Sequence, residues 1–188
     1  TFLVPSYLKS EFTFKSGQYI TLKTLINGSE VRRDYSLSSS PKSGDLTITV
    51  KEIEKGLFST YANNTLNPGD YIEVGIPNGR FIYEPQIAKK SSIVAFAAGS
   101  GITPIISIIK TALLANTDNE IILIYGNKSP EQTIFHNELL DLQERNSDRF
   151  KIQFIYSRSD EEGAIFGRIN VANVNYILKN NIDLNSSH

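Results

Sequence analysis

The sequence predicts two domains: an antiparallel six-stranded β-barrel over residues 1–86, followed by a doubly wound α/β domain with a parallel sheet over residues 92–188. In the first part, short runs of alternating apolar and polar residues are separated by turn sequences such as Asn27-Gly28. This pattern is typical of antiparallel strands and hairpins. In the second part, the continuous apolar run 93–98 indicates a strand that is buried on both faces. Strand and helix patterns then alternate, which favours a parallel sheet.

Turn sequences divide the first part into six extended segments. The expected strands are 1–5, which we take as the end of a strand, 18–26, 31–38, 46–53, 71–74 and 80–83. We expect a short helix at 57–64, and a polar linker at 84–92 that leads into the second domain.

The second part has three strand patterns and three helix patterns. We expect strands at 93–98, 120–125 and 150–156, and helices at 103–115, from Ser129 onward, and at 170–178. The helix from Ser129 has a capping-box pair, a proline at its first position and an apolar stripe of Phe135, Leu139 and Leu142. Because a doubly wound domain with three strands is small, we expect the chain to be incomplete at its C-terminus, where it ends in residues 185–188.

The composition is that of an ordinary globular protein and excludes several kinds of chemistry. The 188 residues carry a net charge of −1, so nothing indicates a nucleic acid or a membrane partner. The absence of cysteine excludes thiolate catalysis and Cys-ligated metal clusters within the sequence. With His136 and His188 the only histidines, we expect no metal site and no histidine base. We expect a cytoplasmic protein.

The stretch Arg33-Asp34-Tyr35-Ser36-Leu37 suits a flat, phosphorylated ligand. Residues two apart on a strand face the same way, so Arg33 and Tyr35 are expected to project together. An arginine grips a phosphate with a planar fork of donors, and a tyrosine ring stacks on a flat heterocycle. Ser36 and Leu37 offer backbone groups to the ring edge, where a flavin has N5 and O4. Taken alone, the stretch also fits an ordinary strand with a surface arginine.

A second motif, Gly56-Leu57-Phe58-Ser59, opens the expected helix 57–64. Free N–H groups and the helix dipole favour an anion there, although Ser59 alone would also fit a simple helix cap. Together the two motifs favour a flavin site, with Tyr35 and Ser36 as the catalytic contacts. The expected flavin-binding residues are Arg33, Tyr35, Ser36, Leu37, Lys51, Gly56, Leu57, Phe58 and Ser59.

A third motif, Gly99-Ser100-Gly101-Ile102-Thr103-Pro104, lies where a buried strand ends and a helix begins. Glycine allows close approach of the backbone to a ligand, and the helix N-terminus suits a pyrophosphate. We expect Thr103 to be the N-cap and Pro104 the first helical residue. A lone Gly-x-Gly turn is also common as a plain tight connection. Gly126 and Asn127 close the next strand at the same carboxyl edge, where such sheets bind ligands.

Ser157 and Arg158 end the third strand at that edge. A hydroxyl beside a guanidinium suits the 2′-phosphate of NADPH and would select NADPH over NADH. The residues equally allow a solvated arginine that pairs with Asp160 or Glu161.

These motifs resemble those of the ferredoxin–NADP reductase superfamily. Residues 33–37 resemble its R-x-Y-S flavin motif, residues 56–59 its G-x-x-S phosphate motif, and residues 99–104 its G-x-G-x-T-P nucleotide loop. Ser157-Arg158 resembles its 2′-phosphate pair. Residues 97–105 and 123–128 are most similar to the reductase subunits of bacterial ring oxygenases, especially those of the phenylacetyl-CoA epoxidase type.

The resemblance implies an NAD(P)H-dependent flavoprotein reductase that uses FAD, or FMN as in some branches, and NADPH or NADH. It implies hydride transfer to the flavin and single-electron transfer to a ferredoxin-type [2Fe–2S] domain or protein, fused C-terminally or separate, within an oxygenase complex of phenylacetate degradation. Two other interpretations stay open: a flavin-binding module with a structural or regulatory role and no nucleotide turnover, and an adaptor without any cofactor.

Overall fold

A computed structural model describes residues 1–85, 92–115 and 119–181 of the chain. The chain divides into two compact units. The N-terminal unit comprises Thr1–Pro85 and Thr103–Ala115, and the C-terminal unit comprises Gln86–Ile102 and Asn116–His188. Most of the predicted linker 84–92 and the predicted chain end 185–188, with His188, lie outside the described residues.

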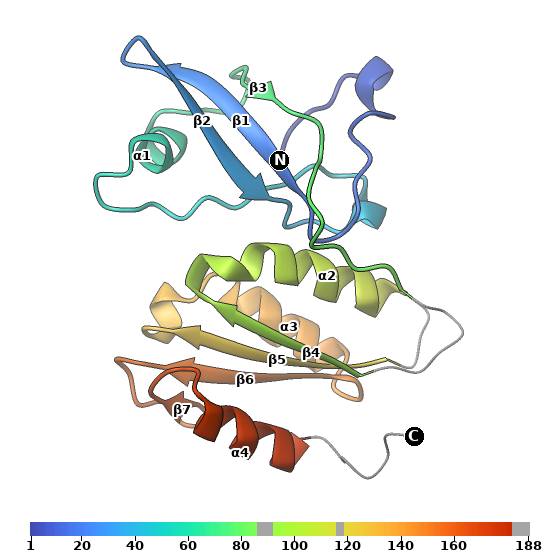
Figure 1. The fold of residues 1–188 in the computed structure, drawn as a ribbon, viewed down its shortest axis with the longest axis vertical. Helices are drawn as coiled ribbons and strands as arrows, with labels where there is room; N and C mark the ends of the chain where they lie inside the picture. Colours follow the sequence, from blue (N-terminus) through green and yellow to red (C-terminus); the bar gives the residue numbers. More distant parts are fainter. Residues whose placement is uncertain (86–91, 116–118, 182–188) are drawn as a thin grey trace. The chain divides into compact units, whose positions relative to one another are not determined.

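An antiparallel sheet forms the centre of the N-terminal unit. Its strands are β1 (Tyr19–Ile26), β2 (Ser29–Ser36) and β3 (Glu73–Val74), in the order β2-β1-β3 (Figure 1). Asn27 and Gly28 join β1 to β2 with φ angles of 52° and 77°. Two successive positive φ angles are those of the hairpin turn that Asn-Gly favours, so the predicted hairpin is confirmed.

The remaining strands of the predicted six-stranded barrel are present only as isolated bridges. These pair Phe2 with Leu46, Ser16 with Tyr83, Tyr19 with Asn78 and Leu37 with Ile48. The strand count is therefore confirmed only in part. In the segment 46–53, Leu46 is buried but Ile53 is 66% exposed, so the alternation marks buried positions only in part. Its backbone groups also accept hydrogen bonds from outside a ladder. The Val50 carbonyl, for example, accepts from the Asn63 side chain at 3.4 Å.

Short helices complete the N-terminal unit. Two are 3₁₀ turns, η1 (Ser6–Leu8) and η2 (Pro41–Ser43). Helix α1 (Leu57–Asn64) has the predicted bounds, and α2 (Ile102–Leu114) begins one residue earlier than predicted. The buried core of this unit consists of Ile20, Leu22, Ile26, Val31, Leu37, Leu46 and Phe58.

A parallel sheet forms the centre of the C-terminal unit. It contains β4 (Ser92–Ala98), β5 (Glu120–Asn127), β6 (Phe150–Tyr156) and β7 (Ile165–Phe166), in the order β4-β5-β6-β7. The register places Ala98 beside Gly126 and Asn127 beside Tyr156. The carboxyl ends of β4, β5 and β6 therefore meet at one edge, as the alternating pattern predicts.

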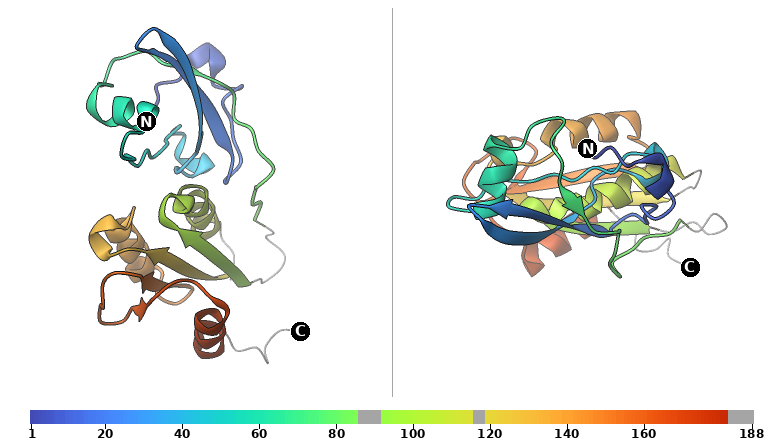
Figure 2. Two further views of the ribbon diagram at one scale, coloured as in Figure 1. Left: turned by 60° about the vertical axis from the view of Figure 1, so that its left-hand side comes forward. Right: turned by 90° about the horizontal axis from the view of Figure 1, so that it is seen from above.

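Helices α3 (His136–Arg145) and α4 (Val171–Asn181) lie on opposite faces of this sheet (Figure 2). Ile177 of α4 packs in a buried cluster with Ile124 and Ile155. On the other face, the His136 ring of α3 lies 5.1 Å from the ring of Phe154. Because neighbouring strand residues point to opposite faces, Phe154 packs against α3 on one face and Ile155 packs against α4 on the other. The predicted doubly wound arrangement is confirmed.

The predicted helix start at Ser129 is wrong. Only a single 3₁₀ turn, η4 (Pro130–Gln132), forms there, and the Ser129 side chain makes no capping bond. Phe135 then takes a left-handed conformation with φ of 62°, and α3 begins at His136. Proline fits a 3₁₀ turn as well as an α-helix, so the capping pattern did not distinguish one turn from a full helix.

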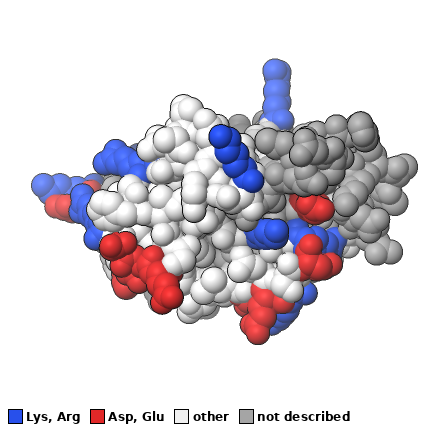
Figure 3. Space-filling view, turned by 90° about the horizontal axis from the view of Figure 1, so that it is seen from below, with Lys and Arg blue, Asp and Glu red and all other residues white. Residues whose placement is uncertain are grey.

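Charges of both signs are spread over the surface. Figure 3 shows basic and acidic side chains interspersed with uncharged ones on one face, in line with the net charge of −1. In the described part of the chain, no helix combines the length and apolarity needed to cross a bilayer.

Two leucines of β1 test whether the inner face of the sheet is the core. Leu22 is 1% exposed and Leu25 is 69% exposed. We expect Leu22→Ala to lower the free energy of unfolding by about 2–5 kcal/mol because it leaves a cavity. Leu25→Ala, the matched control, should change it by less than about 1 kcal/mol. Urea denaturation followed by circular dichroism measures both, and equal losses would contradict the assigned register.

Candidate functional site

The structure brings the two predicted flavin motifs together within the N-terminal unit. The ring of Tyr35, near the end of β2, lies 5.4 Å from the ring of Phe58, in the first turn of α1. Phe58 is 2% exposed and belongs to the core, whereas Tyr35 is only half-buried. Phe58 therefore holds α1 against the strand that carries Arg33 and Tyr35.

The register of the hairpin sets the direction of Arg33 and Tyr35. Tyr35 lies opposite Ile20 and Arg33 lies opposite Leu22. Directly opposed residues of antiparallel strands share a face, so Arg33 and Tyr35 project on the same face as the buried Ile20 and Leu22. Arg33 itself is exposed. A cation at the margin of an apolar face suits a ligand that has a flat apolar part and an anionic part.

The Arg33 guanidinium has no acidic partner among the described residues. Its hydrogen bond is to the carbonyl of Arg32, at 2.6 Å. The neighbouring Arg32 differs, because its Nε donates to the Glu30 carboxylate at 2.8 Å. Arg33 therefore keeps most of its donors for a phosphate or another anion.

Tyr35 and Ser36 also keep polar groups that the described protein atoms do not use. No hydrogen bond within the described residues involves the Tyr35 hydroxyl, and burial raises its pKa while Arg33 opposes that rise. Leu37 donates its N–H to the Gln18 carbonyl at 2.9 Å, on the β1 side. Because donors alternate along a strand, the Ser36 N–H points from the outer edge of β2, an edge strand of its sheet.

The structure does not support the predicted role of the Leu37 backbone as a donor to the flavin ring. Its N–H is engaged by Gln18, and its side chain is fully buried in the core. The contribution of a Leu37 N–H to a ligand is therefore not supported. Of Ser36 and Leu37, only Ser36 directs its backbone N–H to the outer edge of β2.

The second motif forms a tight turn that starts α1. The Ser59 hydroxyl donates to the Gly56 carbonyl at 3.2 Å and accepts from the Ile53 N–H at 3.1 Å. Ser59 is 5% exposed, so its hydroxyl shapes the turn and does not face a ligand. A Cβ on Gly56 would lie 2.4 Å from the Ser59 Oγ, which explains why glycine is needed here.

The first turn of α1 leaves backbone donors for an anion. The N–H groups of Leu57, Phe58 and Ser59 come before Thr60, whose N–H makes the first bond of the helix, to the Gly56 carbonyl. These three N–H groups have no hydrogen-bond partner in the described part of the chain. Three such donors at a helix N-terminus, together with the helix dipole, favour a phosphate. The backbone of the motif, and not the Ser59 side chain, is thus suited to the predicted role.

A pocket of about 450 Å³ opens at this helix end. Its lining residues are Leu25, Ile26, Asn27, Lys55, Gly56, Leu57, Thr60, Tyr61 and Thr65. Lys55 was missed from the sequence; it is exposed, with φ of 59°, directly before Gly56. The position of Lys55, a cation directly before the predicted helix, would have indicated that it can contribute to an anion site. Lys51, predicted as a flavin contact, is also exposed but does not line this pocket.

The nucleotide motif forms a 3₁₀ turn, η3 (Gly99–Gly101), between β4 and α2. Gly99 has φ of 51°, and a Cβ on Gly99 or Gly101 would meet no atom within 4 Å. The turn therefore presents bare backbone to open space, as close approach of a ligand requires. Because α2 begins at Ile102, Thr103 and Pro104 are in its first turn, and the prediction of Thr103 as N-cap is wrong.

Gly126, Asn127, Ser157 and Arg158 lie together at the carboxyl edge of the sheet in the C-terminal unit. Ser157 donates its N–H to the Asn127 carbonyl at 3.0 Å, and its hydroxyl lies 3.3 Å from the same oxygen. A Cβ on Gly126 would lie 3.3 Å from the side chain of Ile169, so a larger residue there would require Ile169 to shift.

Arg158 is exposed and forms no ion pair with a described residue. The alternative partner Glu161 instead accepts a hydrogen bond from the Ser159 hydroxyl. The sequence allowed a pairing of Arg158 with Asp160 or Glu161 and a ligand-binding arginine equally, and this geometry favours the second.

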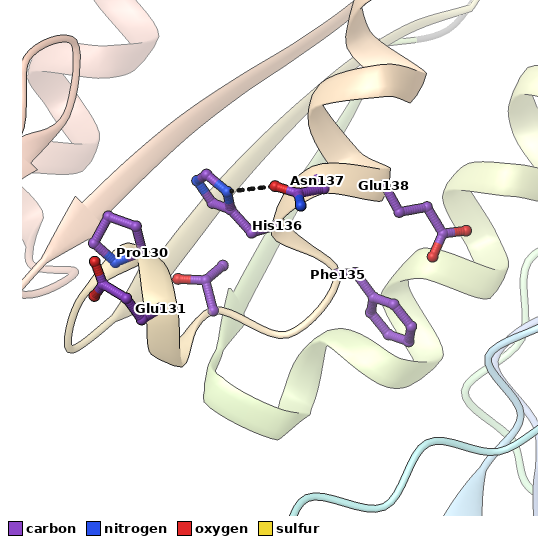
Figure 4. Close-up of a pocket in the computed structure, with 7 residues that line it drawn as sticks. Pro130, Glu131, Phe135, His136, Asn137 and Glu138 are labelled. Carbon is purple, nitrogen blue, oxygen red and sulfur yellow. Dashed lines mark hydrogen bonds between the residues drawn. The ribbon is translucent and has the colours of Figure 1, made fainter.

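A second pocket, of about 540 Å³, lies beside η4 and the start of α3. Figure 4 shows Pro130 and Glu131 of η4 on one side and His136 and Asn137 on the other, with a 3.4 Å contact between the His136 Nδ1 and the Asn137 Oδ1. His136 is half-buried against Phe154 and has no carboxylate as a hydrogen-bond partner in the described residues. The contact with Phe154 gives His136 a packing role.

Comparison with known proteins identifies the two halves of the chain. Residues 2–83 match the family model of the oxidoreductase FAD-binding domain, and residues 96–186 match that of the oxidoreductase NAD-binding domain. This order of domains defines a class of flavin- and pyridine-nucleotide-binding oxidoreductases. The chain belongs to the ferredoxin–NADP reductase family.

Relatives of the chain include a subunit of an epoxidase and the ferredoxin reductase component of a monooxygenase. A subunit of 1,2-phenylacetyl-CoA epoxidase from Escherichia coli (strain K12) is 38% identical over 170 residues, which cover 90% of this chain and 48% of the relative. The ferredoxin reductase component of 3-ketosteroid-9-alpha-monooxygenase from Rhodococcus rhodochrous is 35% identical, with coverage of 80% and 42%. The chain thus spans about half the length of these relatives.

A solved structure shows the same fold. The flavohem-like FAD/NAD-binding domain of nitric oxide dioxygenase from Vibrio cholerae O1 biovar El Tor aligns with a TM-score of 0.72 and 25% identity, and the alignment covers 85% of this chain and 68% of that one. The resemblance of the sequence motifs to the ferredoxin–NADP reductase superfamily is therefore confirmed.

Arg33 and Arg32 form a matched pair for testing the flavin site. They are adjacent on β2 but point to opposite faces, and only Arg32 has a carboxylate partner. We expect Arg33→Ala to weaken FAD binding about tenfold or more, the effect of losing a charged hydrogen bond to phosphate. Arg32→Ala should leave the affinity within about twofold. Quenching of flavin fluorescence on titration measures both dissociation constants, and equal effects would remove the assignment of Arg33.

Gly56 tests the turn that starts α1. A Cβ there would also lie 2.9 Å from the Ile53 carbonyl, so Gly56→Ala must shift the turn. We expect a loss of about 1–3 kcal/mol in the free energy of unfolding and weaker FAD binding. Gly75→Ala is the control, because its Cβ would meet only ordinary contacts of 3.6 Å or more. Unchanged FAD binding in Gly56→Ala would show that the turn is not part of the site.

Proposed function

We propose that this chain is the cofactor-binding part of an NAD(P)H-dependent flavoprotein reductase. The observation that carries the proposal is the meeting of the Arg-x-Tyr-Ser strand and the Gly-x-x-Ser helix start, through Tyr35 and Phe58, within one unit. The family membership supports it, because the chain has an FAD-binding domain followed by an NAD-binding domain. We place the boundaries of these domains at residues 1–86 and 92–188.

The residues divide the work of holding a flavin. Arg33 and the N-terminal N–H groups of α1 are the donors for its phosphates, with Lys51 and Lys55 as further cations nearby in sequence. Tyr35 is the ring that packs against the flat heterocycle, and the Ser36 N–H is the donor at its edge. A bound flavin accepts a hydride from a reduced nicotinamide and releases the electrons one at a time.

The residues at the carboxyl edge of the parallel sheet are proposed to hold the nucleotide. The Gly99–Gly101 turn and the start of α2 receive the pyrophosphate, because bare backbone at a helix N-terminus suits it. Gly126 and Asn127 line the same edge, and Ser157 and Arg158 receive a 2′-phosphate. The free Arg158 guanidinium supports NADPH over NADH.

We further propose that electrons pass to a ferredoxin-type iron–sulfur partner that serves an oxygenase. Support comes from two relatives, one named as a subunit of an epoxidase and the other as the ferredoxin reductase component of a monooxygenase. The similarity to the epoxidase component supports a role in phenylacetate degradation.

An anaerobic titration tests the reductase function directly. The chain loaded with FAD is titrated with NADPH while the visible absorption band of the flavin is followed. We expect the band to bleach with a stoichiometric amount of NADPH. If dithionite bleaches the band but neither NADPH nor NADH does, the chain is a flavin-binding module without nucleotide turnover, and the proposal fails.

The nucleotide preference is tested by replacing both Ser157 and Arg158 with alanine. The loss of charge-assisted hydrogen bonds to the 2′-phosphate should reduce kcat/KM for NADPH about tenfold or more. The value for NADH should change by less than about twofold. Arg145→Ala on α3, where Arg145 pairs with Asp141 at 2.9 Å, is the control for a surface arginine. Equal losses for both nucleotides would contradict the assignment.

A further inference from the structure

Tyr125 connects two loops at the carboxyl edge of the parallel sheet. Its side chain is fully buried in β5, and its hydroxyl donates to the carbonyl of Gly99 at 2.8 Å. The carbonyl of Ile134, just before α3, lies 3.4 Å from the same hydroxyl. Since a hydroxyl has one proton, the shorter contact, to Gly99, is the principal bond.

The Gly99 carbonyl is the point from which the nucleotide turn is built. It accepts a second hydrogen bond, from the N–H of Ile102, the first residue of α2. Gly99 itself has φ of 51°, a conformation that glycine adopts but does not strongly prefer over others. Two donors on one carbonyl therefore select a single conformation for a turn whose glycines would otherwise allow many.

The sheet fixes the place of the Tyr125 hydroxyl. Tyr125 pairs in register with Ala97, two residues before Gly99, and its ring lies 6.3 Å from that of Phe154 on β6. Burial raises the pKa of Tyr125 to about 12, so the hydroxyl stays protonated and remains a donor at neutral pH.

A second buried tyrosine at the same edge provides the contrast. Tyr156, at the end of β6, is 2% exposed, but its hydroxyl has no hydrogen-bond partner among the described residues. The rings of Tyr156 and Phe154 stack at 5.8 Å, so Tyr156 contributes packing. Of these two tyrosines, Tyr125 is the one that combines packing with a bond to the nucleotide turn.

We propose that Tyr125 is a positioning residue whose hydroxyl holds the Gly99–Gly101 turn in the conformation that receives a dinucleotide pyrophosphate. The inference rests on the proposed function, because it assigns the turn to the nucleotide. Tyr125 acts through the Gly99 carbonyl and touches no part of the nucleotide. The geometry makes the turn preformed, so that binding does not have to order it.

Tyr125→Phe tests this role, with Tyr156→Phe as the matched control. Each variant removes one hydroxyl from a buried ring and leaves the ring in place. The measurements are calorimetric Kd values for NADP⁺ and for NAD⁺, amide hydrogen exchange over residues 99–102 without nucleotide, and urea denaturation. We expect Tyr125→Phe to raise both Kd values about tenfold and to speed exchange at the turn. Tyr156→Phe should change neither.

Two results would overturn the proposal. One is a Tyr125→Phe variant with wild-type Kd values and wild-type exchange over residues 99–102. The other is an equal loss of affinity in Tyr156→Phe, which would assign the effect to general packing. If the wild-type chain binds neither NADP⁺ nor NAD⁺, the proposed function fails, and the exchange rates at the turn still decide whether Tyr125 holds it.

Discussion

The antiparallel pairing of β1 with β2 places Ile20 opposite Tyr35 and Leu22 opposite Arg33, and the proposed flavin site depends on that register. A slip of one residue would turn Arg33 and Tyr35 to the outer face and bring Arg32 and Asp34 inward. Two features prevent it. The Asn27-Gly28 turn fixes the loop length, and the burial of Ile20 and Leu22 ties the inner face to the core. The site thus uses the same face that stabilises the unit, with Arg33 at the margin where that face becomes exposed.

The parallel sheet gives the nucleotide residues a common edge by a different principle. Strands that run in one direction end together, so residues at 99, 126–127 and 157–158 meet although many residues separate them in sequence. Hydrogen bonds between the loops then hold them: Tyr125 holds Gly99, and Ser157 is held by Asn127. The side chain of Arg158 is exposed and stays outside this network, which leaves it available for the proposed 2′-phosphate.

Much of this could be predicted from the sequence because the strongest signals are periodic or steric. The hairpin at Asn27-Gly28, the bounds of α1 and β6, and the parallel sheet follow from alternation, turn chemistry and continuous apolar runs. The differences arise where a local pattern has two physical outcomes. Pro130 starts a 3₁₀ turn as readily as an α-helix, and the hydroxyl of Ser59 is consumed by the Ile53 N–H and the Gly56 carbonyl. The bond from Tyr125 to Gly99 joins residues 26 apart in sequence, and no sequence pattern indicates it.

We propose that the N-terminal unit binds a flavin between the strand of Arg33 and the first turn of α1. Gel filtration of the purified chain after incubation with FAD, followed by a visible absorption spectrum of the protein peak, tests it most directly. We expect one FAD to elute with each chain, with a visible band that differs from that of free FAD. A chain that is folded by circular dichroism but elutes without flavin would contradict the claim.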